Sequence, residues 1–304
     1  FLYEQSLIED NRQIFYYRIN FSSPFRTGNP KNDKVFLDCF LPSKLESLLI
    51  ILPGLGEGFL QNAILKRFAK KLAQNGRGVC ILSLPYHNQR SSEDVRSGKL
   101  FLNLDAQETL DFFQQAVLDT ERTIDFFEDK FDLKDFSILG ISLGSIIAII
   151  SMAKDKRINK AILLLCGGNF FKILWRGLLY FFAKKDCNYR ECRDNFKKLK
   201  QYQLKNFTDI KNLKFPKECM YYEPLVFARL LRERKILMFN SLFDMLIPFN
   251  SARELWKELG RPKIYWFPTE HHSIFLFSPL ILVKIKRFLN SKEEIRKCCK
   301  CKLF

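Results

Sequence analysis

The sequence lacks several features that would place it in a common class of protein. No internal repeat occurs at the periods of solenoids or propellers, which excludes a repeat architecture. No long stretch has the composition of a disordered tract, and 47% of the 304 residues are hydrophobic, which is enough to bury a large core. No zinc-finger or RNP signature accompanies the basic residues, so nucleic acid is not an expected partner.

Histidine is scarce, because only His87, His271 and His272 are present. Nine cysteines are present, but most stand singly in apolar segments, which is typical of reduced core thiols rather than of a disulfide framework. The exceptions are a pair at 187–192 and three cysteines at 298–301. Since the matched cysteine pairs or histidines of a zinc site are missing, neither a metal nor another cofactor is expected.

Residues 1–30 lack the basic and then apolar layout of a signal peptide, which favours a cytoplasmic location. The chain begins at Phe1 rather than at methionine, so export or anchoring by an upstream segment stays open. The formal net charge is +17, from 50 basic and 33 acidic residues. The basic residues are dispersed, as lysines on solvated helix faces are, although an anionic membrane surface or an acidic substrate would also suit this charge.

One uncharged run, from Phe136 to Ala153, is about as long as a membrane-spanning helix. Its centre reads Gly140-Ile141-Ser142-Leu143-Gly144, and the two glycines would interrupt a single helix there. Strand-like and helix-like segments alternate along much of the chain, which predicts right-handed crossovers and a doubly wound, mostly parallel α/β sheet. That sheet needs a strand at 135–142, so the run is interpreted as strand, turn and helix.

The same alternation divides the chain into an edge, a core, an insertion and a tail. Strands at the sheet edge are predicted within 1–45, an α/β core over 46–167 and 234–290, a helical cap insertion over 168–233, and a basic, cysteine-rich tail over 291–304. The insertion interrupts the alternation between two core strands.

Residues 170–185 of the insertion are dense in aromatic and aliphatic side chains with basic ends. Three interpretations are open. The segment lines an acyl pocket, contacts a membrane peripherally, or packs as a core helix.

A serine between two glycines at a strand-to-helix turn is the pattern of a nucleophile elbow. Such a turn exposes Ser142 above the sheet edge, but a serine hydroxyl needs a base, and the base needs an orienting acid. Asp244 follows a strand-like segment, and His271 and His272 follow the last one. The order serine, acid, histidine, with each at the end of a strand, is the order that the elbow requires.

Over about residues 46–290 the chain resembles an α/β-hydrolase. The segments that carry the resemblance are ILPGLG, LPYHNQR, GISLGS, LFDMLIP and GRPKIYWFPTEHHS, which resemble the esterase-like branch related to dienelactone hydrolases and acetyl esterases. That branch commonly has P-x-G-H-x-S/T, and Pro268-Thr269-Glu270-His271-His272-Ser273 matches it with Glu270 in place of glycine. This alignment favours His271 as the base, and the departure at Glu270 keeps His272 as the alternative.

The resemblance implies an oxyanion hole made by the backbone N–H groups of Leu143 and Leu55. His87 and Arg90 follow a strand at the same edge, where they either contact substrate or fasten the loop. The expected function is a serine hydrolase that cleaves carboxylic esters of small molecules through an acyl-serine intermediate. The alternatives are a membrane-surface lipase or acyltransferase, and a non-catalytic binding protein of the same fold.

Overall fold

The structure is a computed structural model that describes most of the chain. The described residues are 2–10, 13–56, 59–91, 97–99, 104–179, 188–202 and 204–291. Apart from its first residue, the tail predicted at 291–304 lies outside the described residues, and so does the end of the aromatic segment at 170–185.

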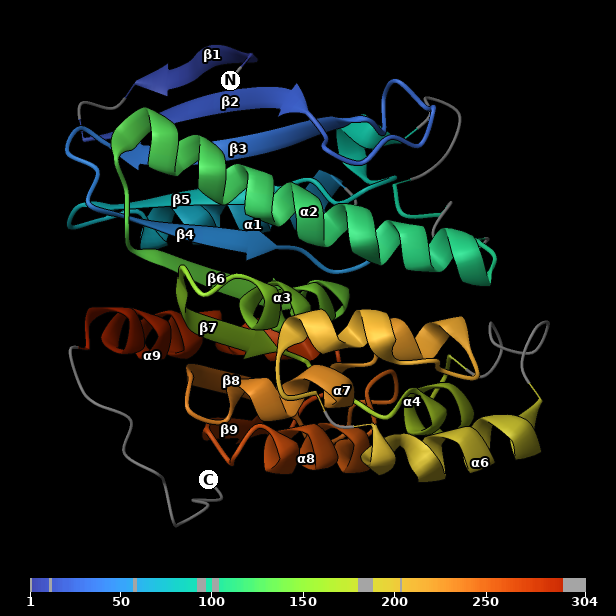
Figure 1. Cartoon of the computed structure of the whole chain (residues 1–304). Helices are drawn as coiled ribbons and strands as arrows, with labels where there is room; N and C mark the ends of the chain where they lie inside the picture. The colour runs from blue at the N-terminus through green and yellow to red at the C-terminus, as the bar shows by residue number, and fades with distance from the viewer. Residues whose placement is uncertain are drawn as a thin grey trace.

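Nine strands of the described chain form one sheet in the order β1-β2-β3-β5-β4-β6-β7-β8-β9 (Figure 1). Strands β4 to β9 pair in parallel, whereas β1, β2 and β3 add an antiparallel edge to β5. The bounds are β1 Tyr3–Asp10, β2 Ile14–Ser22, β3 Lys34–Pro42, β4 Ser47–Leu52, β5 Arg77–Leu82, β6 Phe136–Ile141, β7 Ile158–Leu164, β8 Lys235–Ser241 and β9 Lys263–Phe267. The predicted doubly wound, mostly parallel sheet is confirmed.

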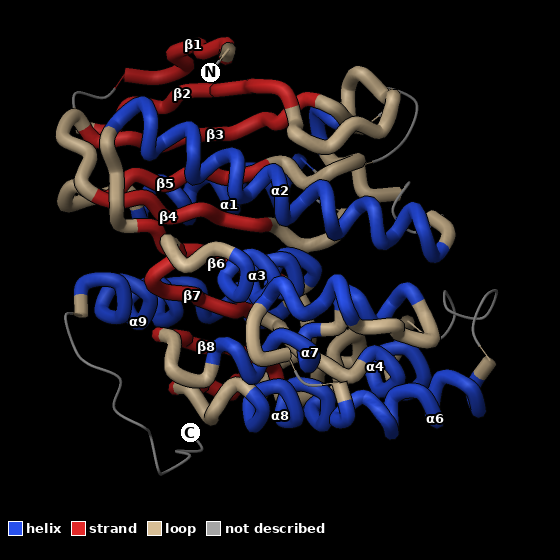
Figure 2. Tube along the Cα trace, viewed as in Figure 1, coloured by secondary structure: helices blue, strands red, loops and turns tan. Residues whose placement is uncertain are grey.

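Helices cover both faces of this sheet (Figures 1 and 2). Helices α1 and α9 pack on one face, while α2 and α3 pack on the other. Their bounds are α1 Phe59–Leu72, α2 Ala106–Phe131, α3 Leu143–Lys154, α8 Phe249–Glu258 and α9 Ser278–Asn290. Helix α2 begins at a capping box, in which Asp105 accepts a hydrogen bond from the backbone N–H of Glu108 and the Glu108 side chain accepts one from the N–H of Asp105.

The uncharged run at 136–153 is divided between β6 and α3, as the glycine pattern predicts. Every residue of β6 is buried, and so is nearly all of α3, because the strand lies in the middle of the sheet and the helix packs against it. Among the described residues, none of the helices is both long and apolar enough to cross a membrane.

Two elements differ from the sequence prediction. Strand β1 was not predicted, because most of its side chains are exposed and it therefore lacks the alternation of a half-buried strand. The last helix, predicted at about 272–290, is a 3-10 turn at Ser273–Phe277 followed by α9. Pro279 has no backbone N–H and cannot extend an α-helix from the preceding turn, which accounts for the change.

The insertion at 168–233 lies between β7 and β8 and is helical where it is described. Helices α4 (Phe170–Arg176), α6 (Tyr189–Lys198) and α7 (Pro224–Ala228) lie beside α3 and α8 (Figure 1). The side chains of Phe170, Phe171 and Ile173 are buried against the rest of the protein. For this part of the aromatic segment, the contacts favour the core-helix interpretation.

A buried carboxylate joins the beginning of the insertion to its later part. Glu223 is fully buried and accepts hydrogen bonds from the backbone N–H groups of Asn169 at 2.6 Å, Phe170 at 2.8 Å and Leu225 at 3.1 Å. Burial raises the pKa of Glu223 to about 7 despite these donors, and the charge of Glu254 acts in the same direction. Sequence reasoning missed this residue, although the apolar and aromatic residues on both sides of it, from Met220 to Ala228, were an available signal of burial.

The raised pKa predicts how stability depends on pH. The folded protein holds the Glu223 proton up to about pH 7, while the unfolded chain releases it near the ordinary value of 4.5. Glu223 therefore lowers the free energy of unfolding as pH rises from 4.5 through 7, by about 3 kcal/mol in total. Glu223→Gln removes this slope.

Urea unfolding of both proteins between about pH 5 and pH 8 measures the effect. The difference in unfolding free energy between Glu223→Gln and the wild type is expected to shift in favour of the variant as pH rises. Glu218→Gln, at an exposed position of the same insertion, is the control and should follow the wild type at every pH. Parallel curves for wild type and Glu223→Gln would contradict the prediction.

Candidate active site

Ser142 occupies the turn between β6 and α3 with a strained backbone. Its φ is 51° and its ψ is −113°, a region that residues other than glycine rarely adopt and that costs about 1–3 kcal/mol. Two hydrogen bonds hold the turn, from Ser142 N to Leu164 O at 2.8 Å and from Ser145 N to Ser142 O at 2.9 Å. Such a strained strand-to-helix turn presents the side chain at the sheet edge, as in a nucleophile elbow.

The two glycines of the elbow are needed for close backbone packing. A Cβ at Gly144 would clash with Leu52 O and lie 2.5 Å from Pro53 O, and a Cβ at Gly140 would lie 2.5 Å from Gly144 O. The turn therefore packs directly on the end of β4. Ser145 is fully buried and donates to Leu164 O at 2.9 Å, so its hydroxyl is used in packing the elbow.

The structure brings Ser142, His271 and Asp244 into one hydrogen-bonded chain. His271 Nε2 lies 3.1 Å from Ser142 Oγ, and His271 Nδ1 lies 2.7 Å from Asp244 Oδ2. The Asp244 carboxylate accepts a hydrogen bond from Nδ1–H, so the proton of the neutral ring stays on Nδ1 and the lone pair of Nε2 faces the serine hydroxyl. This tautomer lets the imidazole take the hydroxyl proton.

Neighbouring strands position the acid and the histidine. Asp244 follows β8 and His271 follows β9, and because these strands are adjacent and parallel their carboxyl ends meet at one edge. The two loops are joined by Ser241 Oγ and Thr269 Oγ1 at 2.8 Å and by Phe243 N donating to Thr269 O at 3.1 Å. These contacts fix the imidazole relative to the carboxylate.

Backbone donors fix the carboxylate itself. Asp244 Oδ1 accepts from Leu246 N at 2.9 Å and from Ile247 N at 2.8 Å, and the residue is 6% exposed. Both oxygens are therefore held, and the carboxylate cannot rotate away from the ring without losing three hydrogen bonds.

His272 lies beside the chain rather than in it. Its ring is largely exposed and stands edge-on to that of His271, with 5.2 Å between ring centroids. Partial burial and the charge of His271 lower the pKa of His272. Within the described residues its ring makes no hydrogen bond to Ser142 or Asp244, so of the two histidines His271 has the position that a general base requires.

Of the two residues expected to form an oxyanion hole, Leu143 follows Ser142 directly and Leu55 follows a loop that packs on the elbow. Leu143 is the first residue of α3, where backbone N–H groups are free of helix partners and the helix dipole favours negative charge. Leu55 follows Pro53-Gly54, and a Cβ at Gly54 would lie 3.7 Å from Ser142 Cβ, so this loop packs on the elbow. The role of both N–H groups stays a prediction.

Arg90, expected either to contact substrate or to fasten its loop, has no exposed surface. Its guanidinium forms an ion pair with Asp119 of α2 at 2.7 Å and donates to the backbone oxygens of Asn32 and Ser83. Because these contacts hold the guanidinium inside the protein, they favour the interpretation that Arg90 fastens its loop.

His87 is also fully buried, and its surroundings point to the same interpretation. Its Nδ1 donates to Pro85 O at 2.7 Å, and burial lowers the pKa of His87 to about 4, so the ring is neutral. A Cβ at Gly98 would lie 2.8 Å from both His87 Nε2 and Gly56 N. The ring therefore lies close to the loop that carries Leu55.

Exposed apolar side chains flank the hydrogen-bonded chain, and sequence reasoning missed them. Phe243 and Met245, on either side of Asp244, are 64% and 57% exposed, and Leu276, five residues after His271, is 81% exposed. The segment LFDML already contained the signal, because two large apolar residues enclose the aspartate. A contiguous patch of such side chains marks contact with an apolar partner or ligand, whereas single exposed ones need no explanation.

The strand order, the elbow after β6, the acid after β8 and the histidine after β9 together define the α/β-hydrolase fold. Comparison with known proteins gives the same fold from structure alone. No protein-family model and no curated protein matches the sequence.

Solved structures are similar over nearly the whole chain. One is a cold-adapted esterase from an Arctic intertidal metagenomic library, with 16% identity over 95% of this chain and 100% of that chain and a TM-score of 0.57. Another is the acetyl xylan esterase from Paenibacillus sp. R4, with 15% identity over 94% of this chain and 87% of that chain and a TM-score of 0.63. A third, the acylaminoacyl peptidase of Pyrococcus horikoshii, has 15% identity over 93% of this chain and 43% of that chain, with a TM-score of 0.60. The predicted α/β-hydrolase fold is confirmed.

Proposed function

We propose that the protein is a serine hydrolase that cleaves carboxylic esters through an acyl-serine intermediate. The observation that carries the proposal is the hydrogen-bonded chain from Ser142 Oγ through His271 to Asp244, on a strained strand-to-helix turn where the serine is only partly buried. The similarity of the fold to esterases supports the choice of an ester over other acyl substrates.

In the first half of the proposed reaction, Ser142 Oγ attacks the ester carbonyl carbon while His271 Nε2 takes the hydroxyl proton. The negative charge on the carbonyl oxygen is stabilised by the N–H groups of Leu143 and Leu55. The carbon–oxygen bond to the leaving alcohol then breaks, and His271 returns the proton to that oxygen. The acyl group stays on Ser142.

In the second half, His271 takes a proton from water as the water oxygen attacks the acyl carbon. The bond to Ser142 Oγ breaks, the proton returns to the serine, and the carboxylic acid leaves. Asp244 keeps the imidazole in the productive tautomer and stabilises the imidazolium in both halves, and the two backbone donors to its other oxygen keep it in place.

Labelling with a fluorophosphonate probe tests the proposal, because the probe reacts with activated serines. We expect one adduct, located at Ser142 by mass spectrometry, and none in Ser142→Ala. Ser145→Ala is the matched control, since Ser145 lies in the same elbow but is buried in a hydrogen bond to Leu164 O, and this variant should still be labelled. A well-folded wild-type protein that stays unlabelled, with and without detergent, would refute the proposal in favour of a binding protein.

A second candidate function, hydrolysis of esters at a membrane surface, is favoured by the exposed Phe243 and Met245, which adjoin Asp244 in the chain, and by Leu276, five residues after His271. The net charge of +17 would add attraction to anionic lipid. Sedimentation with phosphatidylglycerol vesicles tests this candidate, with phosphatidylcholine vesicles as the neutral control. We expect the protein to bind the phosphatidylglycerol vesicles, and this binding should weaken with added salt and in Leu276→Ser. If the protein bound neither type of vesicle, this candidate function would be dismissed.

A further inference from the structure

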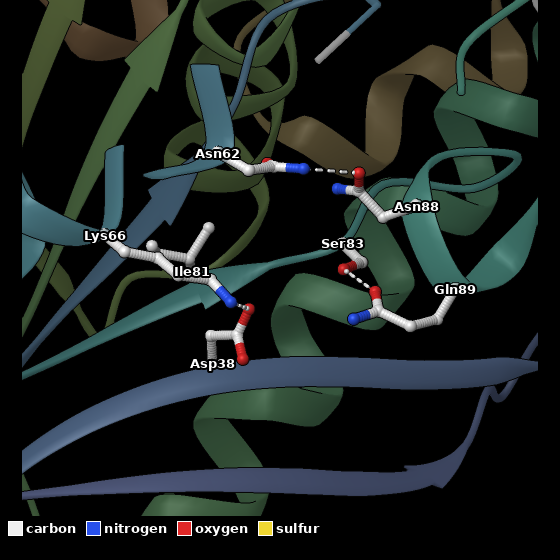
Figure 3. A pocket seen from close by; sticks show the side chains of 7 residues that line it. All are labelled: Asp38, Asn62, Lys66, Ile81, Ser83, Asn88 and Gln89. Carbon is white, nitrogen blue, oxygen red and sulfur yellow. Dashed lines mark hydrogen bonds and ion pairs between the residues drawn. The ribbon is translucent and has the colours of Figure 1, made fainter. Parts of the chain in front are cut away.

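A polar cavity of about 370 Å³ lies beside α1, and neither Ser142, Asp244 nor His271 lines it (Figure 3). Its walls come from β3, the first half of α1, the end of β5 and the 3-10 turn Asn88–Arg90. This volume is at the lower end of the range for small-ligand sites. Among the described residues that line the cavity, Ile81 is the sole apolar one, so the walls do not suit an acyl chain.

The two charged side chains that line the cavity, Asp38 and Lys66, form an ion pair with each other. Lys66 Nζ lies 2.9 Å from Asp38 Oδ2 and also donates to Tyr16 Oη at 2.9 Å. The other carboxylate oxygen accepts from Tyr16 Oη at 2.5 Å and from Arg18 Nε at 3.4 Å. An anion would meet the Asp38 carboxylate and a cation would meet the Lys66 ammonium, so the wall favours a neutral ligand.

Three side-chain amides and one hydroxyl around the cavity are held in fixed orientations. Asn62 Nδ2 donates to Asn88 Oδ1 at 2.8 Å, and Ser83 Oγ donates to Gln89 Oε1 at 3.1 Å. Figure 3 shows that the amide nitrogens of Asn88 and Gln89 then point to the side on which Lys66 lies. Because these groups are already ordered, a ligand would not have to immobilise them.

The chemistry of this wall identifies the class of ligand. The amide nitrogens of Asn88 and Gln89 are donors, and the Asn62 amide oxygen and the Asp38 carboxylate are acceptors. A hydroxyl group both donates and accepts, so several hydroxyls on one small ring match such a mixed wall. We propose that the cavity is a binding site for a small neutral polyhydroxylated molecule, a single sugar ring or a cyclic polyol, separate from the site at Ser142.

The chain around the cavity connects it to the loop near Ser142. Asn88 and Gln89 line the cavity, and the preceding residue, His87, lies with Gly56 beside Gly98. Asn88 has a φ of 50° and is held by a hydrogen bond from its N–H to Ser97 Oγ at 3.0 Å. A ligand on Asn88 and Gln89 would therefore restrain the segment that packs near Gly56. The binding site itself does not depend on the proposed ester hydrolysis.

Titration of the ¹⁵N-labelled protein with methyl β-D-glucopyranoside and with myo-inositol tests the proposal. The side-chain NH₂ signals of Asn62, Asn88 and Gln89 report on the cavity directly in proton–nitrogen spectra. We expect these signals to shift in a saturable way, with a dissociation constant on the order of 1 mM for at least one of the two probes, as befits a ligand held by a few hydrogen bonds.

Two variants alter the cavity without filling it. Gln89→Met removes the amide at nearly constant length, and Asn88→Asp replaces a donor by an acceptor in a residue that tolerates positive φ. Each should weaken binding roughly tenfold or more. Gln107→Met, at an exposed glutamine of α2 that bonds Asp111, is the matched control and should bind as the wild type does. Ser142→Ala should also bind normally.

Several results would overturn the proposal. One is the absence of any shift with both probes up to about 50 mM, a concentration that would reveal even very weak binding. A second is binding of inorganic phosphate in their place, which would mean that Lys66 selects an anion. A third is sugar binding that Gln89→Met and Asn88→Asp leave intact, which would place the sugar outside this cavity. Gln89→Met and Asn88→Asp are separate single-substitution proteins. If one of them fails to fold, the binding measured for the other still decides the test.

Discussion

Replacing His271 with alanine is expected to lower kcat on a p-nitrophenyl ester by about 10⁴-fold or more, because Ser142 then has no base to take its proton. The 3.1 Å separation of Nε2 from Ser142 Oγ and the 2.7 Å contact of Nδ1 with Asp244 both involve this ring alone. Steady-state rates measure the effect, with circular dichroism to show that the variant is folded.

His272→Ala is the matched control for this experiment. The neighbouring ring is exposed and hydrogen-bonds neither Ser142 nor Asp244 among the described residues, so kcat should stay within a few-fold of the wild type. The reverse outcome would be a large loss of kcat in His272→Ala and a small one in His271→Ala. It would assign the role of the base to His272, the alternative in the sequence analysis.

Gly144→Ala is expected to lower the free energy of unfolding by about 4 kcal/mol or more. The added methyl group would clash with Leu52 O and lie 2.5 Å from Pro53 O, and these are backbone atoms at the end of a central strand that cannot turn aside as a flexible side chain can. Urea unfolding measures the change, and loss of soluble protein is the extreme form of the same result.

Gly54→Ala is the comparison, since a Cβ there would meet its nearest neighbours at 3.6 to 3.9 Å, which is ordinary van der Waals contact. Its stability should stay within about 1 kcal/mol of the wild type. Equal stability of Gly144→Ala and Gly54→Ala would show that the elbow relaxes away from β4, and the packing account of the G-x-S-x-G pattern would then be wrong.

The parts of the fold that could be predicted are those in which the sequence shows a strong local pattern. The buried strands and the crossover helices follow from apolar runs and helical periodicity, and the interruption of the run at 136–153 follows from its glycines. The order of Ser142, Asp244 and His271 along the chain predicted their meeting, because parallel strands end at one edge of a sheet. These features depend on local patterns and on topology.

Other features depend on contacts between distant segments, and no local pattern reports them. The burial of Arg90 depends on Asp119, which lies 29 residues later on α2. The burial of Glu223 depends on backbone donors that lie 53 and 54 residues earlier. In strand β1 the side chains on both faces are exposed, so its sequence does not show the apolar alternation that predicts a strand. In each case the deciding partner becomes visible only when the chain is folded.

The separation of 129 residues between Ser142 and His271 has a consequence for the synthesis of this protein. The strained turn at Ser142 and its helix are made first, and β9 and the histidine that follows it are made only later. Closing so long a loop is slow, and β9 has nowhere to pair until β8 has joined the sheet. A nascent chain therefore carries Ser142 without His271, and we expect the proposed hydrolytic activity to appear only after β9 has left the ribosome and docked.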